Sequence, residues 1–192
     1  MTDETPSTSG DHSTKKSGGF LRFIIELVVI LAVVFGLSCL LRTFVFSGYE
    51  IPSGSMETTI MTGDMVFSEK VTYYTRSVEA GDIVTFIDPN DSSRTLIKRV
   101  VAVGGQTVEL KNGYVYVDGE KKDESYTNDL PSYPLTSSIT YPYTVPQDYV
   151  WVMGDNRTNS QDSRYFGAIP VSNITGKAAV IYWPLNRIQF LS

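Results

Sequence analysis

The sequence predicts an all-β, or mainly β, domain that follows one N-terminal membrane-spanning helix. Two observations support this fold class. A single long apolar run lies near the N-terminus, and it is followed by short β-branched and aromatic runs bounded by Gly, Pro, Asn and Asp. The composition, 42% hydrophobic and 19% charged, is that of a globular protein.

The N-terminal part divides into a tail and an apolar run. Residues 1–19 are rich in Ser, Thr, Gly and charge without apolar periodicity, which predicts a disordered cytoplasmic tail. The apolar run at residues 23–41 reaches about 28 Å as a helix, close to the hydrocarbon thickness of a bilayer. We therefore expect a transmembrane helix over residues 20–42, in contact with the lipid bilayer.

The basic residues around the apolar run predict its orientation. Three basic residues precede the run, and only Arg42 follows it before Lys70. This bias places the N-terminus in the cytoplasm and the rest of the chain outside the cell membrane. A cleaved signal peptide is the alternative, since "VFS" ending at Ser47 is an acceptable cleavage site. The run is longer than a usual signal core, which favours a permanent single-pass anchor.

Residues 43–192 have the length of one domain. The tail and the anchor carry equal numbers of acidic and basic residues, so the formal net charge of −5 lies in this outer domain. An acidic domain argues against nucleic acid as a partner. The sole cysteine, Cys39, lies in the apolar run, so no disulfide is expected outside the membrane.

The outer domain is expected to be a β-barrel or sandwich with an inserted lobe. Strands are expected in "DMVFSEKVTYY", "GDIVTFID", "TLIKRVVAV", "TVELKNGYVYVDGE", "YVWVMGD" and "AAVIYW". Asn112-Gly113 predicts a tight hairpin turn. Four Tyr and four Pro between residues 125 and 146 indicate an extended excursion, and we expect the lobe around residues 111–147. The sequence assigns no role to this excursion.

The segment "VFSGYEIPSGSM" immediately follows the anchor and allows two interpretations. Phe44, Phe46, Tyr49 and Ile51 form either a first strand buried in the core or an aromatic rim at headgroup depth. The two interpretations are compatible.

Elimination narrows the chemistry of the outer domain. The sole histidine, His12, lies in the cytoplasmic tail, which excludes a Ser-His-Asp triad and a Cys-His dyad outside the membrane. Zinc and copper sites built from His and Cys are excluded as well, and no metal or cofactor is expected. An enzyme built from these residues needs a hydroxyl nucleophile with Lys, Asp, Glu or an amine as its base, and Ser with Lys is the known combination.

Among the lysines, Lys98 has the most apolar setting. Its same-face strand neighbours in "TLIKRVVAV" are Leu96, Val100 and Ala102. A free lysine has a pKa of about 10.4, and lowering that pKa to about 7 costs about 4 kcal/mol, which burial can supply. Lys98 is therefore either a buried general base or a strand-edge lysine with its head in water.

The polar segment "GDNRTNSQDSRYFG", residues 154–167, predicts a structured loop. Asp162 and Arg164 can form an ion pair that stabilises this loop. Ser160 or Ser163 can offer a hydroxyl that orients a neutral lysine.

Several of these stretches together resemble the bacterial type I signal peptidases, membrane-anchored Ser-Lys proteases that cut signal peptides from exported proteins. The similar stretches, in family order, are "PSGSM", "GDIVTF", "KRVVAVGGQTVEL", "GDNRTNSQDSRYFG" and "GKAAVIYWPLNRI". The resemblance implies that Ser55 is the nucleophile and Lys98 the general base. It also implies that the Ser53 hydroxyl joins the Ser55 backbone N–H in an oxyanion hole. Ser160 matches a serine that hydrogen-bonds the lysine, and Asp162 and Arg164 match a pair that braces the site.

Three positions depart from the family pattern. Thr58 stands where Pro is usual, Ile60 replaces the usual Leu, and Thr158 replaces a common Asp. None of them is a proposed catalytic group, so we expect effects on loop rigidity or specificity.

The resemblance implies a serine endopeptidase that cleaves N-terminal signal peptides from exported preproteins after small residues. The preprotein is expected to bind as an added β-strand. The alternative is a non-catalytic membrane-anchored scaffold or chaperone of the same fold for surface-protein assembly, suggested by Thr58. A self-cleaving Ser-Lys regulator fits poorly with an anchor and no DNA-binding segment.

Overall fold

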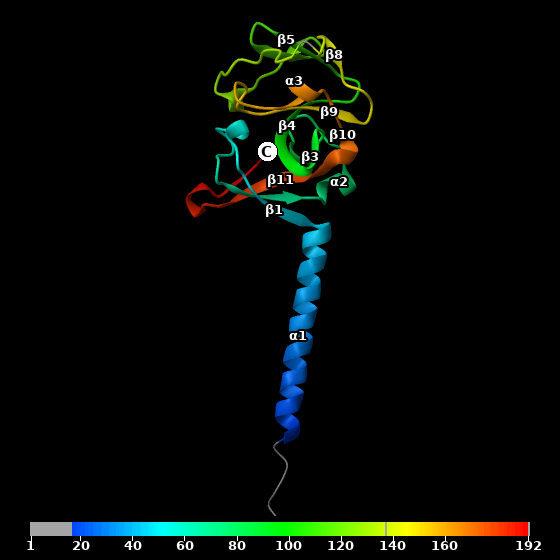
Figure 1. Cartoon of the computed structure of the whole chain (residues 1–192), viewed down its shortest axis with the longest axis vertical. Coiled ribbons are helices and arrows are strands. Elements are labelled where there is room, and N and C mark those ends of the chain that lie inside the picture. Colours follow the sequence, from blue (N-terminus) through cyan, green and yellow to red (C-terminus); the bar gives the residue numbers. More distant parts are fainter. Residues whose placement is uncertain (1–16, 137, 192) are drawn as a thin grey trace, which may run out of the picture. The chain divides into compact units, whose positions relative to one another are not determined.

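The computed structural model describes residues 17–136 and 138–191, and the chain divides into two units, Met1–Leu41 and Arg42–Ser192 (Figure 1). Residues 1–16 of the expected tail lie outside the described residues. Helix α1, Ser17–Phe44, contains the apolar segment Gly19–Leu40. The mean hydropathy of this segment is 2.8, and none of its apolar window is buried within the structure. By length and composition this helix can cross a membrane, and it fits a single-pass anchor.

The second unit is mainly β, which confirms the predicted fold class. Its described strands are β1 Phe46–Glu50, β2 Met65–Glu69, β3 Ile83–Asp88, β4 Asp91–Val103, β5 Thr107–Lys111, β6 Tyr114–Val117, β7 Glu120–Lys121, β8 Tyr143–Thr144, β9 Tyr149–Met153, β10 Ile169–Pro170, β11 Ile174–Trp183 and β12 Gln189–Phe190. Its short helices are α2 Thr72–Thr75, α3 Ser163–Phe166, η1 Gly54–Met56, η2 Ser125–Thr127, η3 Val171–Asn173 and η4 Leu185–Arg187.

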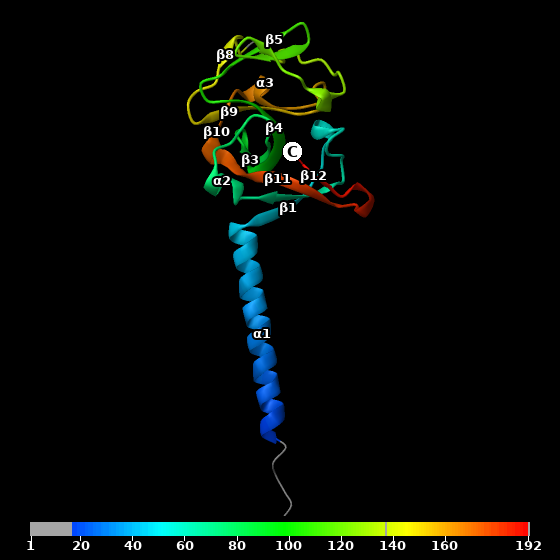
Figure 2. The ribbon, with the colours of Figure 1, turned by 180° about the vertical axis from the view of Figure 1, so that it is seen from behind.

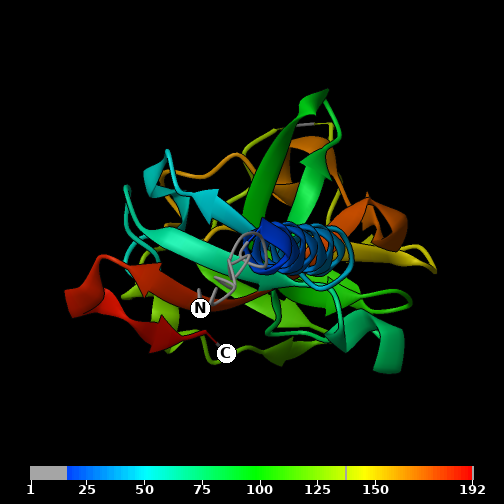
Figure 3. The same ribbon diagram turned by 90° about the horizontal axis from the view of Figure 1, so that it is seen from below.

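The larger sheet is antiparallel and has the order β1-β2-β11-β3-β4-β9-β10, with β12 paired to β11. Figure 3 shows the C-terminal segment, in red, turning back beside β11 as β12. The central hairpin of β3 and β4 pairs Val84 with Lys98. On its other side β4 pairs with β9, where the register shifts between Val100 and Ala102. Lys98 therefore lies on an inner strand of the sheet.

The smaller sheet has the order β7-β6-β5-β8. Asn112 and Gly113 join β5 and β6 with φ angles of 53° and 83°, the pair of positive values that a type I′ turn requires, so the predicted hairpin is confirmed. In both Figure 1 and Figure 2, β5 and β8 lie at the end of the domain opposite β1, with β4 and β9 between. Trp151 of β9 is fully buried in a cluster with Val108 of β5 and Val115 of β6, so this sheet covers one side of β9.

A separate core cluster fixes the segment after β1. Ile51, Met56 and Ile60 are all buried in it, together with Ile97 of β4. Their burial at three points leaves the backbone of η1 little freedom to move. Ile51 supports the interpretation of this segment as part of the core, whereas the rim at headgroup depth stays a prediction.

Candidate active site

Ser55 and Lys98 meet at the contact between η1 and β4. Lys98 Nζ donates to Ser55 Oγ at 2.8 Å and to the carbonyl oxygen of Ile97 at 2.9 Å. Lys98 is only 3% exposed and Ser55 8%. The alternative of a lysine with its head in water is therefore wrong for Lys98.

The electrostatic setting of Lys98 favours the neutral amine. Burial lowers the pKa of Lys98 from 10.5 to about 8, although the surrounding carboxylates, chiefly Asp162, act in the opposite direction. At a pKa of about 8, roughly one amine in ten is neutral at pH 7, compared with one in a few thousand for a free lysine. A neutral amine beside a hydroxyl can act as its general base.

The backbone of η1 is held from the loop that follows β9. The backbone N–H of Asn156 donates to the carbonyl of Ser55 at 3.1 Å, and its side-chain Nδ2 donates to the carbonyl of Gly54 at 3.0 Å. A Cβ at Gly154 would overlap both Ser160 Oγ and the carbonyl oxygen of Ser55. Only glycine allows the loop to approach the turn that carries Ser55 this closely.

Asp162 and Arg164 form a buried bidentate ion pair behind this loop. Arg164 Nε and Nη2 donate to the Asp162 carboxylate at 2.9 and 2.8 Å, and the N–H of Gly154 donates to the same carboxylate at 3.0 Å. Burial alone would raise the pKa of Asp162, but the hydrogen bonds and charge of Arg164 hold it below its ordinary value. The pair fixes Gly154, and through it the approach to Ser55.

The other two expected residues lie beside Ser55 in different settings. Ser53 caps η1, with its backbone extended and its side chain exposed. Ser160 is nearly buried, and its Oγ lies against Gly154. Among the described residues no hydrogen bond joins Ser160 to Lys98, whose amine instead contacts Ser55 and Ile97.

The sequence interpretation missed a second buried ion pair, between Arg99 and Asp155. Arg99 Nε and Nη2 donate to the Asp155 carboxylate at 3.0 and 2.9 Å, and Thr59 Oγ1 donates to it at 2.6 Å. The pair thus joins β4, the loop after β9 and the segment after Ser55. Both residues stand within the motifs quoted above, but the spacing alone gave no sign that they pair.

Comparison with known families identifies the family of the chain. Residues 24–183 match the model of a family described as signal peptidase, peptidase S26. The chain belongs to this family. It is therefore a serine endopeptidase of the class that cleaves signal peptides, and the resemblance to signal peptidases is confirmed.

Individual signal peptidases are similar along most of the chain. It is 41% identical over 173 residues to a probable signal peptidase I-1 of Synechocystis sp., covering 86% of each chain. It is 35% identical over 195 residues to a signal peptidase I of Leptolyngbya laminosa, covering 97% of this chain and 92% of that one. A solved signal peptidase I from Enterococcus faecalis V583 is 25% identical, with a TM-score of 0.43, over 53% of this chain and 97% of that one. The two sequence relatives are both described as signal peptidases.

The departures from the signal peptidase pattern lie outside the Ser55–Lys98 contact. Ile60 is fully buried, so it fills the core as a leucine would. Thr58 and Thr158 are exposed. Thr58 Oγ1 accepts a hydrogen bond of 3.2 Å from Nδ2 of Asn128, a residue of the Tyr- and Pro-rich excursion.

Proposed function

We propose that the chain is a membrane-anchored endopeptidase that removes N-terminal signal peptides from exported preproteins with a Ser55–Lys98 dyad. The observation that carries this proposal is the 2.8 Å contact between the Lys98 amine and the Ser55 hydroxyl, both buried. The outer domain has neither histidine nor cysteine, so no other nucleophile–base pair of the common types competes with the dyad.

The reaction proceeds in two halves. Neutral Lys98 accepts the hydroxyl proton of Ser55 while Ser55 Oγ attacks the scissile carbonyl carbon. The C–N bond then breaks, Lys98 returns the proton to the leaving amine, and the mature protein departs. A water next gives a proton to Lys98 and attacks the acyl-enzyme. Ser55 leaves with that proton, and the signal peptide departs with a new carboxylate.

The negative charge that develops on the carbonyl oxygen requires fixed donors. We assign the Ser53 hydroxyl and the Ser55 backbone N–H to this oxyanion hole. The cap position of Ser53 supports the assignment, because its side chain is exposed beside the nucleophile and makes no capping hydrogen bond with η1. Asp162 and Arg164 support the dyad by holding the loop that contacts Ser55, and Ser160 supports it by packing against Gly154 of that loop.

The substrate is expected to add to the catalytic domain as an extended strand, with backbone hydrogen bonds giving affinity and shallow pockets admitting small side chains before the cut. The division of the chain into a tail of residues 1–19, an anchor of residues 20–42 and a catalytic domain of residues 43–192 remains a prediction. So do the cytoplasmic N-terminus and the extracytoplasmic catalytic domain. The exposed apolar surface of α1 supports contact with the lipid bilayer.

Cleavage of a purified preprotein by the full chain in detergent tests the proposal. Ser55→Ala and Lys98→Ala are each expected to abolish the trimmed product, while Ser172→Ala, an exposed serine of η3, keeps wild-type activity. Wild-type trimming by Ser55→Ala would remove Ser55 as nucleophile. Binding of the preprotein without trimming by the wild-type chain would support the scaffold instead.

A further inference from the structure

Residues 124–128, here called the strap, are a part of the inserted lobe that contacts the catalytic part of the domain. Glu124 accepts two hydrogen bonds from the buried guanidinium of Arg157, at 2.6 and 2.8 Å. The ring of Tyr126 covers the Arg99 guanidinium, 4.0 Å from its Cζ. At the far end Asn128 contacts Thr58. The strap thus touches the base strand, the loop after β9 and the nucleophile segment.

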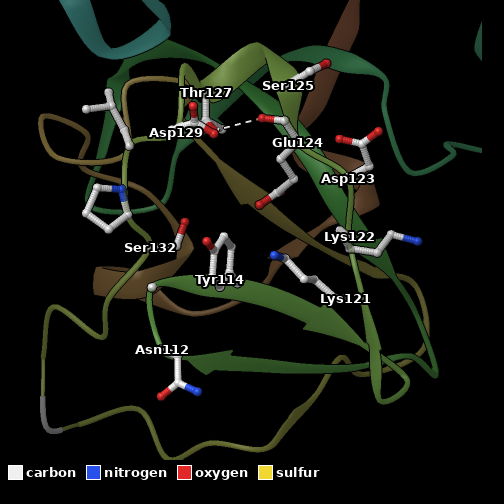
Figure 4. A pocket seen from close by; sticks show the side chains of 13 residues that line it. Asn112, Tyr114, Lys121, Lys122, Asp123, Glu124, Ser125, Thr127, Asp129 and Ser132 are labelled. Atoms are coloured by element: carbon white, nitrogen blue, oxygen red, sulfur yellow. Dashed lines mark hydrogen bonds between the residues drawn. The ribbon is translucent and has the colours of Figure 1, made fainter.

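The other side of the strap faces a pocket of the lobe. Figure 4 shows this pocket, about 510 Å³ in volume, between the Asn112–Tyr114 turn, β7 and the strap. Ser125 and Thr127 line it, whereas Tyr126 is not among the lining residues. Because an open polar pocket gives little packing support, the position of the strap depends on its contacts with the catalytic part.

The Arg99 guanidinium, against which the Tyr126 ring stacks, is connected by hydrogen bonds to the turn that carries the nucleophile. Arg99 holds Asp155 by two hydrogen bonds, and the next residue, Asn156, holds the carbonyls of Gly54 and Ser55. Tyr126 is itself held because its hydroxyl donates to Glu124 at 3.0 Å. A continuous series of contacts therefore runs from the Tyr126 ring to the Ser55 backbone.

We propose that Tyr126 is a positioning residue for Ser55, acting through Arg99 and Asp155, and this inference rests on the function proposed above. The ring closes one face of the guanidinium of Arg99, a residue that is 4% exposed, so loss of the ring would admit water and free Arg99 to tilt away from Asp155. A small displacement of a reacting group lowers the rate far more than it lowers substrate binding.

Steady-state cleavage of a signal-peptide substrate by the full chain tests the inference. Tyr126→Leu keeps an apolar side chain but loses the aromatic face, and it is expected to lower kcat roughly 5–30-fold with KM unchanged. Tyr126→Phe keeps the aromatic face and loses only the hydrogen bond to Glu124, so its kcat is expected to lie well above that of Tyr126→Leu. Tyr114→Leu is the matched control, because its ring covers Lys121 in the same lobe, outside this series of contacts.

Three outcomes would overturn the inference: wild-type kcat in Tyr126→Leu, an equal loss in Tyr126→Phe, or a change confined to KM. Should Tyr126→Leu fail to fold, Tyr126→Met replaces it with the same expected results. The inference and the proposed function fail separately. Wild-type cleavage by Ser55→Ala removes the nucleophile whatever Tyr126 does, whereas an inactive Ser55→Ala beside a fully active Tyr126→Leu removes the inference alone.

Discussion

The amine of Lys98 lies 2.8 Å from the hydroxyl of Ser55, across 43 positions of the sequence, in a site from which water is largely excluded. The turn that carries Ser55 is anchored by two neighbours buried in the core, Met56 and Ile60. The strand that carries Lys98 is paired on both sides. Ser55 and Lys98 therefore both stand on rigid elements, which keeps the contact short.

Ser53→Ala is expected to lower kcat about 10²–10³-fold with little change in KM. The hydrogen bond that Ser53 donates to the oxyanion forms only as negative charge develops in the transition state, so its loss affects the rate and not substrate binding. Ser53→Thr keeps a hydroxyl and is expected to recover most of the rate. Steady-state kinetics of both variants on one signal-peptide substrate give the comparison. Equal loss in Ser53→Thr and Ser53→Ala would argue that the position matters for shape and not for its hydroxyl.

Gly154→Ala is expected to reduce both activity and stability. The added Cβ would overlap Ser160 Oγ and the carbonyl oxygen of Ser55, so the loop or the nucleophile turn must move. Gly119→Ala is the control, since Gly119 has a φ of 82° but no heavy atom within 4 Å of the added Cβ. Backbone strain there costs about 1 kcal/mol of stability and should leave kcat intact. Wild-type kcat in Gly154→Ala would contradict the close packing of the two segments.

Lys98→Met is expected to be more stable than the wild-type protein at pH 7, although it is inactive. The lowered pKa of Lys98 means that the unfolded chain binds more protons than the folded chain between about pH 8 and 10.5, so wild-type stability rises with pH across this window. Below pH 8 the folded protein carries the full cost of burying a protonated amine. This cost is about 3 kcal/mol for a fall in the pKa of Lys98 from 10.5 to about 8.

Urea unfolding of Lys98→Met and wild type at several pH values measures this penalty. The stability gap between them should narrow as the pH rises from 8 to 10.5. Lys111→Met, at the exposed end of β5, provides the control. The difference in free energy of unfolding between this variant and wild type should not narrow over the same pH range. A Lys98→Met variant no more stable than wild type at pH 7 would mean that burial of the amine costs nothing.

The sequence was sufficient for the long apolar helix, the β class, the Asn112-Gly113 turn and the apolar setting of Lys98, because each depends on local features. The apolar run has the length of a bilayer, Asn112-Gly113 matches one turn type, and Lys98 has apolar neighbours on its own strand face. Long-range pairings left no such local trace. The strap is the clearest case, because Tyr126 lies in a segment marked only by Tyr and Pro, and its contact with Arg99 depends on how the lobe folds back. The place of the Ser160 hydroxyl, against Gly154 and not bonded to Lys98, likewise depends on the packing of the loop.

The pH dependence of kcat/KM for a short signal-peptide substrate tests the central claim most directly. Since Lys98 must be neutral to accept the proton of Ser55, activity should rise with pH with a midpoint near 8, the pKa to which burial lowers this amine. A midpoint near 10.5, the ordinary value for lysine, or a rate that does not change with pH across this range would contradict the assignment of Lys98 as the base.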